Sequence, residues 1–498
     1  MPHADQQILA VPTRRRFHTQ AAIAILAVFA IFAILLALAP QAVRAQDTRN
    51  VVEPHIPSAC IVLRAHLTAQ GDTLAASDES RPDTAAIQHA LDHCTLGHAV
   101  ELKSDASHDA FLSGPLELRA GVTLLIDQGV TLFASRNPRD YDVIPGKCGT
   151  ITEQPHGCKP MLSGTGVANA AIMGDGVIDG RGGMKILGPD AKDGDLSWWN
   201  LAEKARAHFL QNNPRMIVLT DCDNFILYRI HLRNSPNFHV SYSGGNGFTV
   251  WGITISVPGN ARNADGIDIG QPFPIATRPT TNVTVTHSFI HAGDDIVAAK
   301  SPYGLLTSHI TVAHNHFYTG HGMSIGSATS GGITAMRVSD LTIDGPDNAF
   351  HIKSNTKLGG PVHDIEFFDI CVRNSRNPID IETHYDSTGH EVDGTTPDKL
   401  PHFTDIRFNN VSIAGGGKIT LDGLDAAHPI AITLHNVVLD QPQIYKYVED
   451  NAILHLDGSN LPVSGENVTS TNTQAAASTA PNNCAVRFVP FPDPISPR

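Results

Sequence analysis

Acidic residues precede a short apolar run in the middle of the chain. Segment 291–300, HAGDDIVAAK, carries Asp294 and Asp295 side by side, and segment 318–330, YTGHGMSIGSATS, repeats the frame with His321 in place of the acids. Hydrolysis of a glycosidic bond requires one carboxyl group that holds a proton and another that is ionised. Crowded carboxylates produce this difference because each raises the pKa of its neighbour. The pattern therefore indicates a site that cleaves sugar chains.

Two further segments share this frame, NADGIDIG at 263–270 and FHIKS at 350–354. Aligned by their apolar residues without gaps, the repeats share three levels: Asp265, Asp294 and His321; then Asp268, Val297, Ser324 and His351; then Gly270, Ala299, Gly326 and Lys353. Taken singly, an Asp-Asp pair is a solvated turn, a histidine is a hydrogen-bonded structural residue, and an Asp-rich turn can bind calcium. Their coincidence on successive repeats favours a shared function.

Short alternations of apolar and polar residues recur around these segments and predict the fold. They begin at residues 225, 248, 283, 310, 336, 365, 406 and 432, so they are 23 to 41 residues apart (225 to 248 and 365 to 406 at the extremes). Such alternation is typical of β-strands, and the spacing is typical of a solenoid with loop insertions. We expect an all-β, right-handed parallel β-helix. A β-propeller needs about 40–45 residues per blade, which is more than most of these repeats provide.

The two ends of the solenoid are expected to differ from its body. Segment 83–94, DTAAIQHALDHC, predicts a short amphipathic helix with Asp83 as N-cap and Ile87, Leu91 and Cys94 on one face. This helix would cap the first coil and cover its open sheet edge. We expect the catalytic β-helix domain over 46–460, followed by a low-complexity linker and C-terminal tail over 461–498.

Residues 1–45 have the pattern of a signal peptide. TRRRF at 13–17 is basic, Ala21–Ala39 is an unbroken apolar segment, and Val43 and Ala45 are the residues expected before a cleavage site. The arginines also fit a twin-arginine signal. An uncleaved membrane anchor is the alternative, because an apolar segment of this length can span a bilayer. We expect cleavage after Ala45 and a secreted protein, extracellular or periplasmic, with no membrane contact beyond the export signal.

The charge of the mature chain limits its partners. Removing residues 1–45 removes four Arg and one Asp, which leaves 31 − 48 = −17. So acidic a protein is not expected to bind nucleic acid or anionic membranes. A polyanionic substrate would require a local basic patch. We expect a monomer.

Seven cysteines are present, and export would allow disulfides. Cys148 and Cys158 flank a short loop, and Cys60 and Cys94 bracket an N-terminal segment, so these are the two expected pairs. Cys222, Cys371 and Cys484 cannot all pair with one another. At least one of these is expected to be a buried free thiol.

Four motifs in this order, NADGIDIG, GDDIVAAK, GHGMSIGS and HIKSNTKLGG, resemble the signature segments of the polygalacturonases, glycoside hydrolase family 28. The resemblance extends from about Cys60 to about Asp440 and is nearest to the secreted bacterial pectin-degrading type. It implies a β-helix that hydrolyses α-1,4-linked galacturonan in pectin with inversion, without a metal or other cofactor.

The same resemblance implies roles for individual residues. Asp294 would be the general acid, Asp265 and Asp295 would hold and activate the attacking water, and His321 would support the charge state of the site. The residues implied to bind substrate are Lys353, His351, Tyr385 and Asn263.

Two positions depart from the family pattern. Ala264 replaces a threonine, and His351 replaces an arginine that would hold a galacturonate carboxylate in a bidentate manner. His351 would bind a carboxylate only when protonated, which favours acidic pH. The change could also indicate another unit, as in rhamnogalacturonan or a substituted pectin.

Two other functions remain open from the sequence. A pectate lyase has the same fold but requires calcium and a basic residue that abstracts a proton, whereas acids outnumber bases here. A non-catalytic β-helix that binds sugars is the other possibility.

Overall fold

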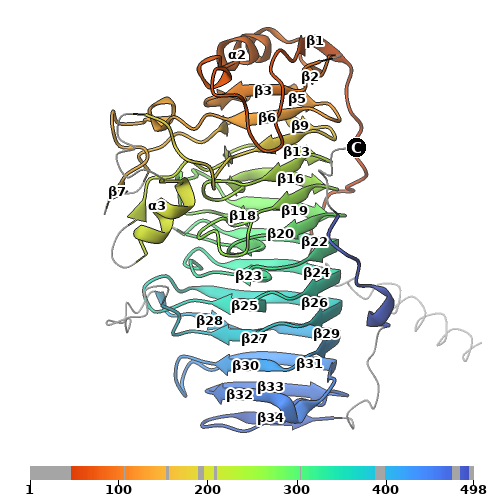
Figure 1. The fold of residues 1–498 in the computed structure, drawn as a ribbon. Coiled ribbons are helices and arrows are strands. Elements are labelled where there is room, and N and C mark those ends of the chain that lie inside the picture. The colour runs from red at the N-terminus through yellow and green to blue at the C-terminus, as the bar shows by residue number, and fades with distance from the viewer. Residues whose placement is uncertain are drawn as a thin grey trace, which may run out of the picture. The chain divides into compact units, whose positions relative to one another are not determined.

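The computed structural model describes residues 46–105, 107–152, 156–188, 196–206, 210–302, 304–386, 399–473 and 483–492. The predicted signal peptide lies outside them. Strands from successive coils pair in parallel, in one sheet of 21 strands and one of 11 strands (Figure 1). This is the right-handed parallel β-helix that the repeats predict. Within the described residues, no helix is long and apolar enough to cross a membrane.

The smaller sheet positions the acidic segments. In spatial order its strands are β4 (Leu116–Glu117), β8 (Leu162–Thr165), β12 (Ile217–Thr220), β15 (Val240–Ser243), β18 (Ile267–Ile269), β21 (Val297–Ala299), β23 (Met323–Ile325), β25 (Asn348–Lys353), β27 (Asn377–Glu382), β30 (Gly417–Asp422) and β32 (Tyr445–Asp450). Sequence order and spatial order agree, so each coil adds one strand to this sheet.

The larger sheet closes the coils. Its strands are β1 (Ala59–Arg64), β2 (His98–Lys103), β3 (Ala110–Ser113), β5 (Val122–Ile126), β6 (Thr131–Ala134), β9 (Ala171–Met173), β10 (Val177–Asp179), β13 (Phe225–Tyr228), β14 (His231–Arg233), β16 (Gly245–Trp251), β17 (Thr254–Ser256), β19 (Thr280–Thr286), β20 (Phe289–His291), β22 (Thr307–Phe317), β24 (Ile333–Asp344), β26 (Pro361–Arg373), β28 (His402–Phe403), β29 (Ile406–Ala414), β31 (Ile430–Leu439), β33 (Ala452–Asp457) and β34 (Thr469–Asn472). Outside these sheets, β7 (Ile151–Thr152) pairs antiparallel with β11 (Leu210–Gln211). The helices are α2 (Thr84–His93), α3 (Trp198–Lys204) and the 3₁₀ turns η1 (Asp78–Ser80), η2 (Pro138–Tyr141), η4 (Pro442–Ile444) and η5 (Cys484–Val486).

Alternate residues of the smaller sheet face inward and form continuous apolar columns. One column runs through Val240, Ile267, Val297, Met323 and Phe350, all of which are fully buried. Because side chains alternate along a strand, the next residue of each strand faces outward. The apolar columns therefore fix the register that aligns the polar residues on the outer face.

The predicted N-terminal helix is present as α2, with Ile87 and Leu91 buried against the first coils. Asp83 precedes it, but its carboxylate makes no capping hydrogen bond. Instead it accepts a 3.0 Å hydrogen bond from the backbone N–H of Leu112. The helix is thus fixed by apolar burial and by a contact with β3.

Three disulfides occur in the described residues. Cys60–Cys94 and Cys148–Cys158 are the two pairs expected from the sequence, and the third joins Cys371 to Cys484. Cys222 is the buried free thiol. Three disulfides are typical of a protein from an oxidising compartment.

The C-terminal segment 483–492 lies against β24 and β26, held by the Cys371–Cys484 bond (Figure 1). Arg487 forms ion pairs with Asp340 and Asp369, at 2.6 and 2.9 Å. The parallel ladder itself continues to β34, within the part that the sequence assigns to a linker and tail.

Candidate active site

The register of the smaller sheet brings the acidic residues together but differs from the ungapped alignment by one residue. Asp268 pairs with Ala298, which pairs with Ser324 and then His351. Asp295 is therefore level with Asp265 and His321. The expected placement of Asp294 and Val297 at the shared levels was wrong.

A one-residue insertion causes this difference. Ile290 pairs with Phe317, and Val297 pairs with Met323. The turn that leads to β21 therefore contains one residue more than the turn that leads to β23. This extra residue changes the direction in which the side chain of Asp294 points. Its side chain is 24% exposed, whereas Asp295 beside it is buried. Asp294 is the acid nearest to solvent.

Three aspartates meet at the outer face of β18 and β21. One carboxylate oxygen from each of Asp265, Asp294 and Asp295 lies within 4.8 Å of the others. Asp265 is buried and one of its carboxylate oxygens has no hydrogen-bond partner in the described chain. Such an oxygen is free to accept a hydrogen bond from a bound water or a sugar hydroxyl.

Two lysines neutralise these acids. Lys353 Nζ lies 3.0 Å from Oδ1 of Asp295. Lys300 Nζ lies 3.7 Å from Asp265 and 3.8 Å from Asp295, in addition to a closer contact with Asp268. Lys353 is buried and the Lys300 side chain is only 13% exposed, so both charges are largely shielded from water, which makes charge interactions stronger.

Lys300 was not predicted, because the ungapped alignment set Asp294, in place of Asp295, level with Asp265. With Asp295 level with Asp265, Lys300 falls at the position of Gly270 and Lys353, the level that the alignment had recognised for Lys353 alone. An alignment that allowed a one-residue gap before β21 would have identified it.

The aspartates differ in proton affinity. Burial, together with the charges of Asp268 and Asp294, raises the pKa of Asp265 well above its ordinary value. Burial acts in the same direction on Asp295, but Lys353 and Lys300 outweigh it and hold that pKa below its ordinary value. Asp265 therefore retains a proton more readily than Asp295, which is favoured in the ionised state that a general base requires.

Asp294 forms a pair with His321, with 3.1 Å between Oδ1 and Nδ1. Burial raises the pKa of Asp294, but the contact with His321 lowers it by more. For His321 the balance is reversed, because burial lowers its pKa and the contact with Asp294 raises it above the ordinary value. Asp294 and His321 therefore form an ion pair at acidic pH.

His351 does not fit the expected role of a cationic carboxylate ligand. Its side chain is only 6% exposed, and its Nδ1 lies 3.1 Å from Nζ of Lys353. Burial and the Lys353 charge lower its pKa well below the ordinary value. The burial of this imidazole beside an ammonium group thus opposes the charged form that the sequence led us to expect at acidic pH.

Two residues named from the family resemblance lie at the site. Asn263 donates from Nδ2 to Oδ2 of Asp294 at 3.4 Å, and its φ of 55° is a left-handed conformation that asparagine tolerates. The ring of Tyr385 lies 5.0 Å from Nζ of Lys353. Both therefore surround the acids at distances suited to contact with a bound sugar.

Among the described residues, three groups bring potential metal-ligand atoms within 4.8 Å: Asp265, Asp294 and Asp295; Asp295, His321 and His351; His351, Asp380 and Glu382. Asp295, shared by the first two groups, is paired with Lys353 and also lies near Lys300. These ammonium groups repel a divalent cation and supply the charge it would contribute. The arrangement suits hydrolysis by carboxyl groups directly.

Comparison with known proteins agrees with this geometry. The family model described as glycosyl hydrolases family 28 matches residues 94–452. An endo-polygalacturonase of Pectobacterium carotovorum subsp. carotovorum is 40% identical over 397 residues, which cover 79% of this chain and 90% of that protein. A polygalacturonase of Ralstonia nicotianae is 37% identical, with 90% of this chain and 94% of that protein covered.

A solved structure supports the same assignment. The polygalacturonase from Erwinia carotovora ssp. carotovora superposes with a TM-score of 0.72 at 38% sequence identity, covering 82% of this chain and 100% of that chain. An exopolygalacturonase from Thermotoga maritima, at 19% identity and a TM-score of 0.65, shares the fold. By sequence and by fold, this chain belongs to glycosyl hydrolases family 28.

Proposed function

We propose that this protein is a secreted polygalacturonase that hydrolyses α-1,4-galacturonosyl linkages in pectin. The observation that carries the proposal is the meeting of Asp265, Asp294 and Asp295, whose carboxylate oxygens lie within 4.8 Å of one another. Family membership supports the reaction class, and the polygalacturonase names of the relatives support the substrate. The disulfides support the export expected from residues 1–45.

Asp294 is the general acid in this proposal, because it is the most exposed of the three aspartates and can reach the leaving oxygen. In the free protein its pKa is lowered by His321. A bound galacturonate brings further negative charge and excludes water, and both effects raise the pKa of a carboxyl group. Substrate binding thus loads Asp294 with the proton that it donates.

Asp265 and Asp295 hold the attacking water between them. Asp295 stays ionised because of Lys353 and Lys300, so it accepts the proton of the water as the water attacks the anomeric carbon. Asp265 keeps its own proton more readily and orients the same water. Lys353 also faces Tyr385, where the ammonium can attract a galacturonate carboxylate.

The test is release of reducing ends from unesterified polygalacturonate by the wild type and by Asp294→Asn. We expect the variant to lose activity about 10²–10⁴-fold while it still binds the polymer. Asp425→Asn, at an exposed loop position, is the matched control and keeps wild-type activity. Undiminished activity in Asp294→Asn would remove this residue from the mechanism. Products that absorb ultraviolet light, or loss of activity in chelator, would identify a lyase.

A further inference from the structure

A cavity of about 260 Å³ adjoins the aspartates on the side of the N-terminal coils. Its lining includes Asn263, which also contacts Asp294, and Arg215, which belongs to none of the contacts described above. The cavity and the site are therefore continuous.

The sheet register places Arg215 in the same column as the aspartates. Ile217 pairs with Val240, and Val240 pairs with Ile267. Two residues earlier on each of these strands, Arg215 falls level with Asp265, two coils away. Adjacent coils are about 4.8 Å apart, so Arg215 lies about 10 Å from Asp265 along the stack. A polymer that lies along the stack over the aspartates also passes Arg215.

Arg215 lacks an anionic partner. Its Nη1 donates to the backbone oxygen of Phe273, and its guanidinium lies 4.6 Å from the ring centroid of Phe238. No carboxylate of the described chain forms an ion pair with it. Burial lowers its pKa, although a guanidinium remains charged in proteins. Arg215 is partly exposed and lines the cavity, so its guanidinium is accessible to an anion that a ligand brings.

Amide groups around Arg215 add neutral hydrogen-bonding capacity. Asn213 donates from Nδ2 to the backbone oxygens of Trp198 and Pro236, whereas its buried Oδ1 has no hydrogen-bond partner in the described residues. Gln211 donates from Nε2 to Asn263, at 3.0 Å, and so connects the cavity to the acids. Amides and one cation are the groups expected for a sugar that carries a carboxylate.

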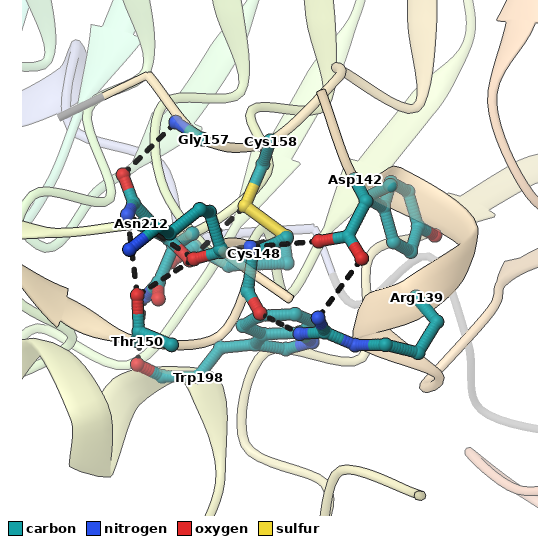
Figure 2. Close-up of a disulfide and its surroundings, with 12 residues drawn as sticks. Arg139, Asp142, Cys148, Thr150, Gly157, Cys158, Trp198 and Asn212 are labelled. Carbon is teal, nitrogen blue, oxygen red and sulfur yellow. Dashed lines mark hydrogen bonds and ion pairs between the residues drawn. A yellow bond between two sulfur atoms is a disulfide. The ribbon is translucent and has the colours of Figure 1, made fainter. Parts of the chain in front are cut away.

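The wall of the cavity is held in place before a ligand arrives. Asn212 accepts a 3.0 Å hydrogen bond from the backbone N–H of Gly157 (Figure 2). It also donates to the backbone oxygen of Lys147. Gly157 lies in the loop closed by the Cys148–Cys158 disulfide, and Lys147 immediately precedes that loop. A preformed wall reduces the entropy lost on binding.

We propose that this cavity is a subsite for the free carboxylate of a galacturonate unit, held by Arg215, and that it selects unesterified over methyl-esterified pectin. The inference rests on the proposed function and specifies where along the groove a free carboxylate is required. A guanidinium binds a carboxylate through two parallel hydrogen bonds, whereas a methyl ester has no charge to pair with it.

The experiment compares wild type, Arg215→Gln and Arg215→Lys on unesterified polygalacturonate and on highly methyl-esterified pectin. For Arg215→Gln we expect KM on polygalacturonate to rise about 10- to 100-fold, the range of a charge-assisted hydrogen bond. We expect kcat/KM on esterified pectin to change less than about threefold, so that the preference between the two polymers narrows. Arg215→Lys keeps the charge but not the bidentate geometry. Its KM on polygalacturonate is expected to lie between those of the wild type and Arg215→Gln.

Arg119→Gln, at an exposed ion pair on the N-terminal coils, is the matched control and leaves both constants unchanged. Circular dichroism and the melting temperature establish that each variant is folded. A folded Arg215→Gln with wild-type KM and wild-type polymer preference would overturn the subsite. A wild type that cleaves neither polymer would instead overturn the proposed function.

Discussion

Lys300 Nζ lies 2.5 Å from Oδ1 of Asp268, a carboxylate that is fully buried beneath the site. The same ammonium group lies within 4 Å of Asp265 and Asp295. One lysine thus compensates three carboxylates from two coils, and it has taken the central position that a metal ion occupies in many acidic sites. Its charge determines how many of these carboxyl groups are ionised at a given pH.

Replacing Lys300 with methionine removes this charge and keeps the length of the side chain. The pKa of Asp295 is expected to rise, so the base is protonated at a higher pH than in the wild type. The acidic limb of the pH profile of kcat should therefore shift to higher pH, with kcat reduced about 10²-fold at the wild-type optimum and KM changed little. Lys300→Arg keeps the positive charge, so its acidic limb should shift less than that of Lys300→Met. An unshifted acidic limb in Lys300→Met would show that Lys300 only fills space.

Asp265 is expected to cost the protein stability at neutral pH. Its pKa in the folded state is raised, so the folded state binds this proton more tightly than the unfolded state does. Stability therefore falls as the pH rises from about 3.9, the unfolded value, through the raised folded value. Asp265→Asn abolishes this loss, and we expect a higher melting temperature at pH 7 but not at pH 3, measured by calorimetry. Reducing-end release should fall about 10²–10⁴-fold. An equal or lower melting temperature at pH 7 would contradict this account.

The coils could be predicted from the sequence because burial leaves a direct record in it. Every second residue of these strands is apolar, as Ile267 and Val297 are. The pairing of these apolar residues between coils brings the acidic segments onto neighbouring strands. The turns leave no comparable record, because one inserted residue is accommodated without changing any strand. The ungapped alignment misplaced Asp294 for that reason, and Lys300 was missed with it.

The charge states of the site residues could not be predicted from the sequence either. His351 is polar and lies in a motif, which indicated a carboxylate ligand, but its charge depends on burial and on the adjacent Lys353. Similarly, Arg215 lies outside every motif, and only the register shows that it shares a column with Asp265. The charge of a side chain and its place in a column depend on neighbours in space, and these neighbours can be distant in the sequence.

His351 is expected to stay neutral throughout the working range of the enzyme. Because its pKa lies well below the ordinary value, acidification from pH 7 to pH 5 should not create a cation at this position. We expect His351→Gln to show the same ratio of KM at pH 7 to KM at pH 5 as the wild type, measured on polygalacturonate. A wild-type KM that falls on acidification, with the fall absent in His351→Gln, would show that the imidazole does become charged.

Inversion at the anomeric carbon follows if a water held by Asp265 and Asp295 is the nucleophile. The α-linked substrate should then yield a β-configured reducing end first, before mutarotation. Proton NMR of trigalacturonate hydrolysis in its first minutes can distinguish the anomers. An initial α-anomer would mean that an aspartate attacks the sugar directly, a reaction that carboxyl groups about 5 Å apart can also support.

The C-terminal segment contacts the turns that carry the acid and its histidine. The hydroxyl of Tyr318 donates to the backbone oxygen of Val489 at 3.0 Å. The ring of Phe491 packs edge-on against Tyr318 and His291, with centroids 5.1 and 5.9 Å apart. Tyr318 precedes His321 by three residues, and His291 precedes Asp294 by three. The tail therefore supports both turns from outside.

Phe491→Ala removes the aromatic contact while the Cys371–Cys484 bond still anchors the tail. We expect kcat to fall about three- to tenfold with KM nearly unchanged, because Asp294 and His321 act on the transition state and their turns lose support. The basic limb of the pH profile should move to lower pH as the pair loosens and the pKa of His321 falls toward its ordinary value. Val486→Ala, at an exposed position of the same segment, is the control. Phe491→Ala with wild-type kcat and pH profile would show that the tail covers the coils without positioning the site.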